Sequence, residues 1–374
     1  MNSDKITVKK AAELVNITQH HVRQLLREGK IGGEQDVETG KWIVNKPSLL
    51  KFKAADINSQ GISGLAKEMR ITIKDAVEAV EEDFDCTVIS YISSPNSPVS
   101  MIDHNDCILL DDLLHSLKQG FPKSTQGKKY KRVCLFLHSG GGILESAIKF
   151  VDIIRQYADE YIVIVPLMAK SAATYMVLEA DKQYFTTLSE LGPVDPIIQS
   201  PTKPDLRVPA TAIYEFINYW GKEGGPYQRN STTDSGTAPM DQLLRAKLDE
   251  VDPYLLGSYM TALKFSREVI EQALREHAMK GKSDTQIEAA LDEFTKAHSS
   301  HGYPISFSTL ERYGIGEKVE DEARLGSIKL LTTVYQQFMA NSNIAKLIGN
   351  REENKNITVM PTQPTRQTPT RTSL

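Results

Sequence analysis

Residues 133–170 alternate between apolar runs and a helical pattern, and this arrangement leaves few folds open. An apolar run ends in three glycines (VCLFLHSGGG, residues 133–142), and residues 143–158 carry apolar side chains at helical spacing. A second apolar run, YIVIVPLMAK, covers residues 161–170. Strand, helix and strand in this order form a βαβ unit, whose parallel strands need helices on their faces. The sequence therefore predicts an α/β core.

The glycines and a serine follow the two apolar runs, where the carboxyl ends of parallel strands meet. Without Cβ atoms, Gly140, Gly141 and Gly142 can adopt positive φ and present backbone N–H groups at a helix start. Ser171 comes directly after the second run and begins the next helix. We expect a nucleophilic Ser171 facing oxyanion donors at Gly141 and Gly142. The alternative is that Ser171 is only an N-cap and the glycines only form a tight turn.

Several site classes lack their motifs in this sequence. The residues around Ser171 read AKSAA, so the G-x-S-x-G elbow of the α/β-hydrolases is absent. Neither a G-x-G-x-x-G after the strand, nor G-x-x-x-x-G-K-[ST], nor H-E-x-x-H occurs. We therefore predict no metal and no nucleotide cofactor.

Four segments in a fixed order carry a resemblance to a known family. They are LHSGGGILESA, MAKSAATYMVLEAD, LGPVDP and HGYPISFSTLERYGIG, which end at residues 147, 181, 196 and 316. In this order they resemble the serine dehydrogenase proteinases, which are related to signal peptide peptidase A and to the proteolytic subunit of Clp. One departure is Gly140, where these families usually have proline. The resemblance implies a crotonase-like (ClpP-type) core of repeated ββα units, and a serine endopeptidase that forms homo-oligomers.

A serine nucleophile needs a base, and the sequence leaves two candidates open. Lys264 lies in a helical stretch that, in the resembling family, carries a lysine at the matching place; burial would make it a proton acceptor. His301 begins the HGYPI segment, and imidazole accepts protons near neutral pH without further help. Lys170 and Lys222 are weaker alternatives. Asp195 could orient a base or simply form a turn before Pro196.

Residues 1–55 form a separate small unit in the sequence pattern. Two short helices are expected at residues 8–15 and 19–29, followed by a two-stranded wing. The pattern resembles the excisionase and MerR-type helix-turn-helix, which implies DNA binding. The outer face of the second helix carries side chains that contact bases and phosphates: Gln19, His20, Arg23, Gln24 and Arg27. Protein docking through the same face is the alternative.

Composition and termini set the remaining expectations. With 374 residues, 40% hydrophobic content and a net charge of −4, the chain can bury a large core and has no global attraction to nucleic acid. The three cysteines are sparse and match no metal motif, which favours a reducing, cytoplasmic setting. No apolar run is long enough to span a membrane. We expect a linker at residues 56–83, where a second helical pair and a plain spacer both remain open, a peptidase domain at residues 84–347 and a disordered tail at residues 348–374.

Three functional hypotheses remain open at this stage. The first is a cytoplasmic serine peptidase that cleaves a peptide or protein substrate and carries a DNA-binding or docking head. The second is a DNA-binding regulator whose crotonase-like domain is a non-catalytic oligomerisation scaffold. The third is a peptidase that cleaves its own linker and so releases the head. The sequence gives no substrate, DNA site or oligomer size.

Overall fold

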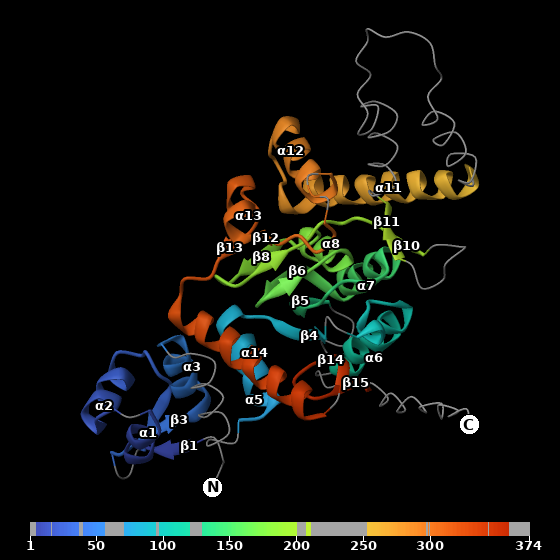
Figure 1. Ribbon diagram of the computed structural model, residues 1–374. Helices are drawn as coiled ribbons and strands as arrows, with labels where there is room; N and C mark the ends of the chain where they lie inside the picture. The colour runs from blue at the N-terminus through green and yellow to red at the C-terminus, as the bar shows by residue number, and fades with distance from the viewer. Residues whose placement is uncertain are drawn as a thin grey trace, which may run out of the picture.

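The computed structural model describes residues 5–15, 17–36, 40–56, 71–94, 97–119, 129–199, 207–210, 253–296, 298, 300–342 and 344–358. These residues build a small N-terminal unit, called the head here (residues 5–56), and a larger α/β unit (Figure 1). The expected alternative base Lys222 and most of the expected linker, residues 57–70, lie outside the described residues.

The head combines three short strands with three helices. Its elements are β1 (Lys5–Thr7), α1 (Val8–Val15), α2 (Gln19–Arg27), β2 (Gly33–Gln35), β3 (Trp42–Asn45) and α3 (Lys46–Asp56). The strands pair antiparallel in the order β1-β3-β2. Helix α2 begins where the Thr18 hydroxyl accepts the His21 backbone N–H, and it buries Val22, Leu25 and Leu26. The two helices and the hairpin lie at the residues where the sequence predicts them.

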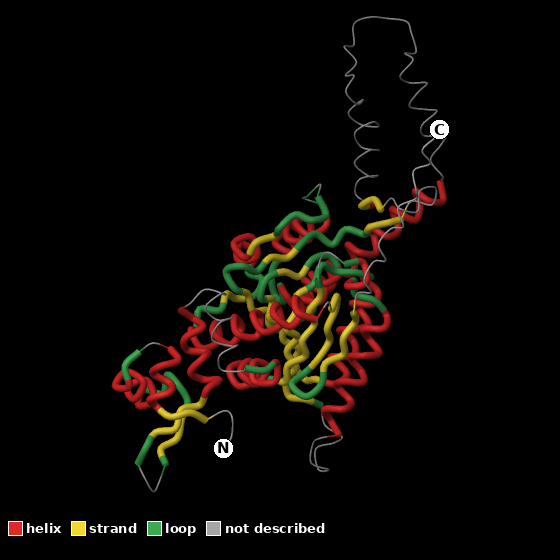
Figure 2. The backbone as a smooth tube through the Cα atoms, turned by 60° about the horizontal axis from the view of Figure 1, so that its bottom comes forward, coloured by secondary structure: helices red, strands yellow, loops and turns green. Residues whose placement is uncertain are grey.

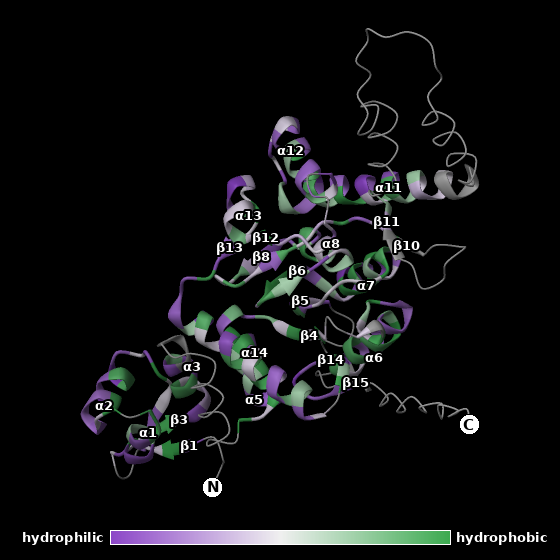
Figure 3. Ribbon diagram, in the orientation of Figure 1, coloured by the Kyte–Doolittle hydropathy of each residue, from purple (hydrophilic) through white to green (hydrophobic). Residues whose placement is uncertain are grey.

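The larger unit is organised around a seven-stranded sheet in the order β13-β8-β6-β5-β4-β14-β15. Its strands are β4 (Thr87–Ser93), β5 (Tyr130–His138), β6 (Ala158–Val165), β8 (Lys182–Phe185), β13 (Glu317–Lys318), β14 (Ile344–Gly349) and β15 (Asn354–Thr358). Neighbouring strands from β13 to β4 run parallel, whereas β14 and β15 are antiparallel additions at one edge. The central strands carry the green of hydrophobic residues in Figure 3.

Helices cover both faces of this sheet. On one face lie α6 (His104–Gln119), α7 (Leu144–Tyr157) and α8 (Ala172–Leu178); on the other lie α5 (Ile73–Phe84) and α14 (Glu322–Ser342). In β5, Leu135 and Leu137 belong to the first core, while Cys134 and Phe136 belong to the second. Red helices accordingly flank the yellow sheet in Figure 2. The α/β class predicted from the βαβ pattern is confirmed, because both faces of the parallel strands are buried.

A further layer lies beyond the carboxyl ends of the parallel strands. It contains a small sheet in the order β12-β9-β7, built from β7 (Met168–Ala169), β9 (Glu190–Leu191) and β12 (Ile305–Ser306). A hairpin joins β10 (Ile197–Gln199) to β11 (Arg207–Pro209). The accompanying helices are α11 (Pro253–Ala273), the π-helical turn η2 (Leu274–Ala278), α12 (Asp284–Thr295) and α13 (Phe307–Tyr313). A single 3-10 turn, η1 (Pro98–Ser100), precedes α6.

One predicted domain boundary needs correction, and one segment takes the helical form that the sequence left open. Within the expected linker and one residue beyond it, α5 (Ile73–Phe84) forms; it buries Val77, Val80 and Phe84 against the main sheet and begins with a Thr72–Asp75 capping box. Residues 354–358 of the expected disordered tail form β15, which pairs with β14. The polar sequence NKNIT hides this strand, because an edge strand needs few apolar side chains. Within the described ranges, no helix combines the length and the apolar character needed to cross a membrane.

Candidate active site

The glycine cluster forms a turn that is fastened to the segment carrying Ser171. Strand β5 ends at His138, and the Ser139 backbone N–H donates to the Met168 carbonyl at 3.1 Å. The Lys170 N–H donates back to the Ser139 carbonyl at 3.0 Å. These two bonds hold residues 139–142, called the glycine turn here, beside the start of α8.

Two glycines of this turn stand where no side chain fits. Gly141 has φ +99°, and a Cβ there would lie 2.5 Å from the Lys170 carbonyl oxygen and 2.8 Å from the Ser171 Cβ. At Gly142, a Cβ would lie 2.2 Å from the Ile102 backbone nitrogen. Real Cβ atoms do not approach other atoms so closely, so glycine is required at both positions. The turn therefore lies in direct contact with the backbone of Ser171.

Ser171 has an unusual backbone conformation. Its φ of 52° and ψ of −123° lie in a region that L-residues avoid, and Asp85 is the only other described non-glycine residue with positive φ. Such conformations cost about 1–3 kcal/mol and concentrate at functional sites. The side chain makes no capping hydrogen bond at the start of α8. Ser171 therefore occupies the N-cap position without capping the helix through its side chain, and its residue is half-buried.

Backbone N–H groups near Ser171 supply candidate oxyanion donors, but they are not quite the predicted pair. The Gly141 N–H donates to the Ser139 hydroxyl at 3.1 Å, so it is already engaged. In the described part of the chain, the N–H groups of Gly142 and Ala172 have no hydrogen-bond acceptor. Ala172 is the first residue of α8, where a free N–H is expected, and its nitrogen lies 3.3 Å from where a Gly141 Cβ would be. Gly142 and Ala172 are the better candidates.

The pKa of His301 is influenced by its burial, by Asp195 and by Lys170, the residue that directly precedes Ser171. Burial, the largest influence, lowers the pKa of His301; the charge and backbone of Asp195 raise it in part, and the charge of Lys170 lowers it. Asp195 itself is 4% exposed. The His301 Nδ1 is buried without a hydrogen-bond partner among the described residues. A neutral imidazole with a free nitrogen is suited to accept a proton.

The Lys170 side chain links its own segment to two others through an ion pair and hydrogen bonds. Its ammonium lies 2.7 Å from the Glu190 carboxylate, 3.0 Å from the Leu191 carbonyl oxygen and 3.5 Å from the Tyr303 carbonyl oxygen. An ammonium whose three protons face three acceptors is poorly placed to take a proton from Ser171. The contacts instead hold residues 190–191 and the loop that follows His301 against the side chain of the residue that precedes Ser171.

Lys264 is placed differently from the sequence expectation. Its side chain is 78% exposed on α11 and pairs with Glu268, one helical turn away, at 3.6 Å. The expected burial is absent, because the apolar side of α11 that faces the core is formed instead by Ile270 and Ala273. No described contact joins Lys264 to Ser171.

Comparisons with known proteins give the following findings. No protein-family model matches the chain, and no curated protein matches it. Among solved structures, one match is a mutant of the 1510-N membrane-bound stomatin-specific protease. The two share 13% sequence identity, the match covers 65% of this chain and 80% of that chain, and the TM-score is 0.35.

The predicted nucleic-acid contacts share one exposed face of α2. All five of these side chains are solvent-exposed: Gln19, His20, Arg23, Gln24 and Arg27. The Arg23 guanidinium donates to Gln19 at 3.3 Å, and the Gln24 amide donates to Glu28 at 2.7 Å. These bonds lie along the helix surface and leave the face open to a partner.

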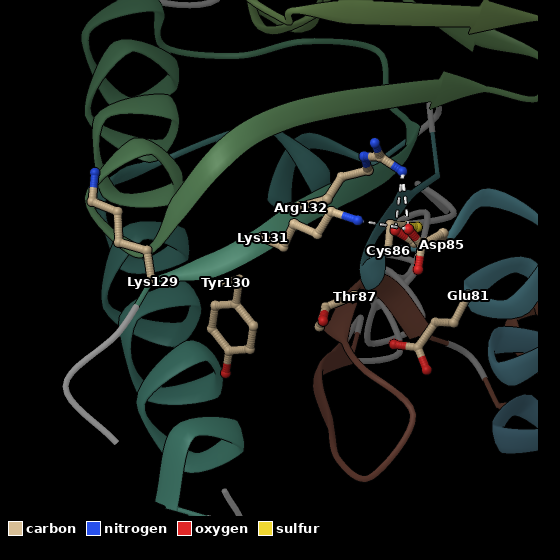
Figure 4. A pocket seen from close by; sticks show the side chains of 8 residues that line it. All are labelled: Glu81, Asp85, Cys86, Thr87, Lys129, Tyr130, Lys131 and Arg132. Carbon is tan, nitrogen blue, oxygen red and sulfur yellow. Dashed lines mark hydrogen bonds and ion pairs between the residues drawn. The ribbon is translucent and has the colours of Figure 1, made fainter. Parts of the chain in front are cut away.

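The described pocket drawn in Figure 4 lies at the amino ends of the parallel strands, whereas Ser171 lies at their carboxyl ends. It has a volume of about 410 Å³, and Thr87 and Tyr130, the first residues of β4 and β5, line it. Its cations already have partners: Lys131 pairs with Asp85 at 3.2 Å, and Arg132 pairs with Asp85 and Glu160. Lys129, which also lines it, donates to the Arg155 carbonyl at 2.9 Å. The pocket is remote from the glycine turn and is not the candidate active site.

Sequence reasoning missed two residues that shape the site. Ala172 could have been found, because the residue after a nucleophilic serine commonly supplies an oxyanion donor. Ile102 could not: it lies 40 residues before Gly142 in the chain, yet its N–H donates to the Gly141 carbonyl at 3.0 Å. Only the folded chain brings these backbones together.

Proposed function

We propose that this protein is a serine peptidase with Ser171 as its nucleophile. One observation supports this proposal most strongly: Ser171 holds a strained positive-φ conformation directly against the glycine turn. Strain at a residue with a reactive side chain and no structural hydrogen bond is best explained by a functional requirement. The small sheet beside the main one also suits the crotonase-like architecture that the motifs suggest.

In the proposed reaction, His301 accepts the proton of the Ser171 hydroxyl as Oγ attacks the substrate carbonyl carbon. The developing oxyanion accepts hydrogen bonds from the Gly142 and Ala172 N–H groups. Collapse of the tetrahedral intermediate expels the amine, which takes the proton from His301 and leaves an acyl ester on Ser171. Water then hydrolyses the ester by the same steps and restores the free serine.

The roles of the two candidate bases follow from their surroundings. Burial and the Lys170 charge keep His301 neutral by lowering its pKa, the Asp195 charge favours the imidazolium that forms on proton transfer, and Nδ1 has no hydrogen-bond partner among the described residues. Lys264 has none of these features. We therefore assign the base to His301 in this proposal.

The head is proposed to bind DNA through α2. Its helix pair and wing have the layout of a winged helix-turn-helix, and the exposed arginines of α2 match the chemistry of phosphate and base contacts. The competing proposal, a non-catalytic scaffold carrying the same head, predicts that Ser171 has no chemical role.

A substrate assay separates these proposals. Purified wild type is incubated with a fluorescently labelled unfolded protein, and fragments are followed over time. We expect cleavage by wild type and none by Ser171→Ala. Ser308→Ala serves as a control, because Ser308 is exposed and bonded to Ser306; it should cleave normally. Equal cleavage by wild type and Ser171→Ala would remove the proposed nucleophile.

A further inference from the structure

A buried lysine lies behind the glycine turn and belongs to no motif. Lys346, in β14, has a side chain that is 0% exposed. Its ammonium donates to the Met101 carbonyl at 2.8 Å and to the Asp103 carboxylate at 3.0 Å, and lies 2.7 Å from an Asp106 oxygen. Burying an ammonium is unfavourable unless such partners compensate it, so this arrangement requires explanation.

The contacts of Lys346 enclose one particular residue. Met101 and Asp103 are the two neighbours of Ile102 in the chain. Ile102 donates its N–H to the Gly141 carbonyl at 3.0 Å and accepts the Ile143 N–H at 2.9 Å. The lysine therefore holds the backbone carbonyl before Ile102 and the side chain of the residue after it, on the two sides of the residue that brackets Gly142.

The carboxylate of Asp106 completes the network from the other side. Asp106 is fully buried and accepts the Tyr91 hydroxyl at 2.8 Å and the Asp103 N–H at 2.9 Å. Strands β4 and β14, which carry Tyr91 and Lys346, are paired neighbours in the main sheet. The segment of residues 101–106 is thus fastened to the rigid sheet, and the glycine turn is fastened to that segment.

We propose that Lys346 is a positioning residue for the oxyanion site. It holds residues 101–103 so that the Gly142 N–H stays aimed at the carbonyl oxygen of a substrate bound at Ser171. This proposal rests on the proposed peptidase function. It assigns no contact between Lys346 and the substrate; the effect passes through the backbone of Ile102.

Labelling with a fluorophosphonate tests this role, because its phosphoryl oxygen occupies the oxyanion site when Ser171 attacks the phosphorus. Two quantities are recorded: the rate constant of labelling and the final fraction labelled. A residue that only stabilises the fold changes the fraction that is active. A residue that positions the oxyanion donor changes the rate constant of the molecules that do react. For Lys346→Met we expect a rate constant about tenfold to hundredfold lower, with a preserved final fraction.

Three further variants make the test specific. Lys51→Met removes another buried lysine. Lys51 pairs with Glu82 and Asp83 and has no contact with the segment of residues 101–106 among the described ion pairs and hydrogen bonds, so the rate constant should not change. Lys346→Met alone leaves the buried Asp106 carboxylate without its lysine. The double variant with Asp106→Asn removes that carboxylate charge as well, and its labelling should remain slow. Asp103→Asn weakens the contact between Lys346 and residue 103 without leaving a buried carboxylate unpaired, and its labelling rate constant should fall by a smaller factor.

The outcomes separate the two proposals. An unlabelled wild type overturns the peptidase function and this inference with it. If wild type labels but Lys346→Met reacts with an unchanged rate constant, the peptidase function stands and the positioning role is wrong. Recovery of the rate in the double variant would also overturn it, because the defect would then come from the stranded carboxylate. If Lys346→Met does not fold, an unchanged rate in Asp103→Asn decides against the proposal.

Discussion

At the scale of single residues, the glycine turn should tolerate substitution at one position and not at another. Gly142→Ala places a methyl group 2.2 Å from the Ile102 nitrogen, so the turn must move and its N–H with it. We expect the rate of fluorophosphonate labelling to fall about 100-fold to 1,000-fold, as on loss of an oxyanion donor.

Gly140→Ala is the matched control for this prediction. Gly140 is exposed, and it is absent from the described glycines with positive φ. Its substitution should leave the labelling rate within about twofold of wild type, because surface changes without strain have small effects. Equal losses of labelling rate in Gly140→Ala and Gly142→Ala would show that any substitution disrupts the turn, and would contradict a specific role for the Gly142 N–H.

The identity of the base predicts a pH dependence. A base must be neutral to accept the serine proton, and burial lowers the pKa of His301 from its ordinary value of 6.5. The labelling rate should therefore rise with pH, with a midpoint below 6.5, and stay high through neutral pH. His301→Gln should lower the plateau by about 100-fold to 10,000-fold. A midpoint well above neutral pH would instead indicate a lysine base.

Residue types and spacing predicted that Ser171 and the glycine turn lie together, because a serine after one strand and glycines after its neighbour meet at the carboxyl ends of the parallel strands. They could not identify which N–H groups are free. That depends on the Ser139 hydroxyl, which takes the Gly141 proton, and on Ile102, which reaches the turn from a distant segment.

At the scale of elements, helix α11 should contribute no base. Lys264→Ala removes an exposed side chain whose ion pair with Glu268 contributes at most about 1 kcal/mol to stability. Labelling rate and unfolding midpoint should both remain close to wild type. A loss of labelling in Lys264→Ala, with the fold intact, would return the lysine to the mechanism.

Helix α2 predicts salt-sensitive DNA binding by the head. Arg23→Ala and Arg27→Ala should each weaken binding to duplex DNA, measured by fluorescence anisotropy at several salt concentrations. Each arginine that contacts a phosphate should reduce the slope of log affinity against log salt by about 1. Lys74→Ala, an exposed lysine of α5, is the charge-matched control and should bind as wild type does. Unchanged binding in the arginine variants would favour protein docking.

Elements with strong periodicity were the easiest to predict from sequence. Residues 143–158 were expected to form a helix, and α7 covers Leu144–Tyr157. By contrast, the sequence left α5 open between a helix and a spacer, because its helical spacing follows the flexible segment NSQGISG and ends in acidic residues. Its apolar positions at Val77, Val80 and Phe84 become meaningful only when α14 and the sheet are present to cover them.

At the scale of the whole molecule, the head is packed on the larger unit. Helices α3 and α14 touch so closely that a Cβ at Gly326 would lie 2.0 Å from the Lys51 carbonyl oxygen. Lys51 also pairs with Asp83 at 3.2 Å, and Leu50 joins the core of the larger unit. In Figure 1 the head lies beside α14, so any partner bound to α2 is held at a fixed position relative to the sheet.

This packing predicts that Gly326→Ala weakens the contact between the head and the larger unit and lowers the stability of the protein. The added methyl group cannot be accommodated against the α3 backbone, and overpacking of this kind destabilises by about 1–3 kcal/mol. The midpoint of thermal or denaturant unfolding should fall. Gly257→Ala in α11 is the control, since nothing lies within 4 Å of its added Cβ; it should be neutral or slightly stabilising. Equal midpoints for the two variants would contradict tight docking of the head.

The central claim is that Ser171 is a chemically activated serine, and covalent labelling tests it most directly. Wild type and Ser171→Ala are incubated with a fluorophosphonate, and each protein is measured by intact mass and by peptide mapping. We predict one adduct per wild-type chain, located on Ser171, and no adduct on Ser171→Ala. A wild-type chain that stays unmodified, or an adduct that persists in Ser171→Ala, would contradict the account and favour the non-catalytic scaffold.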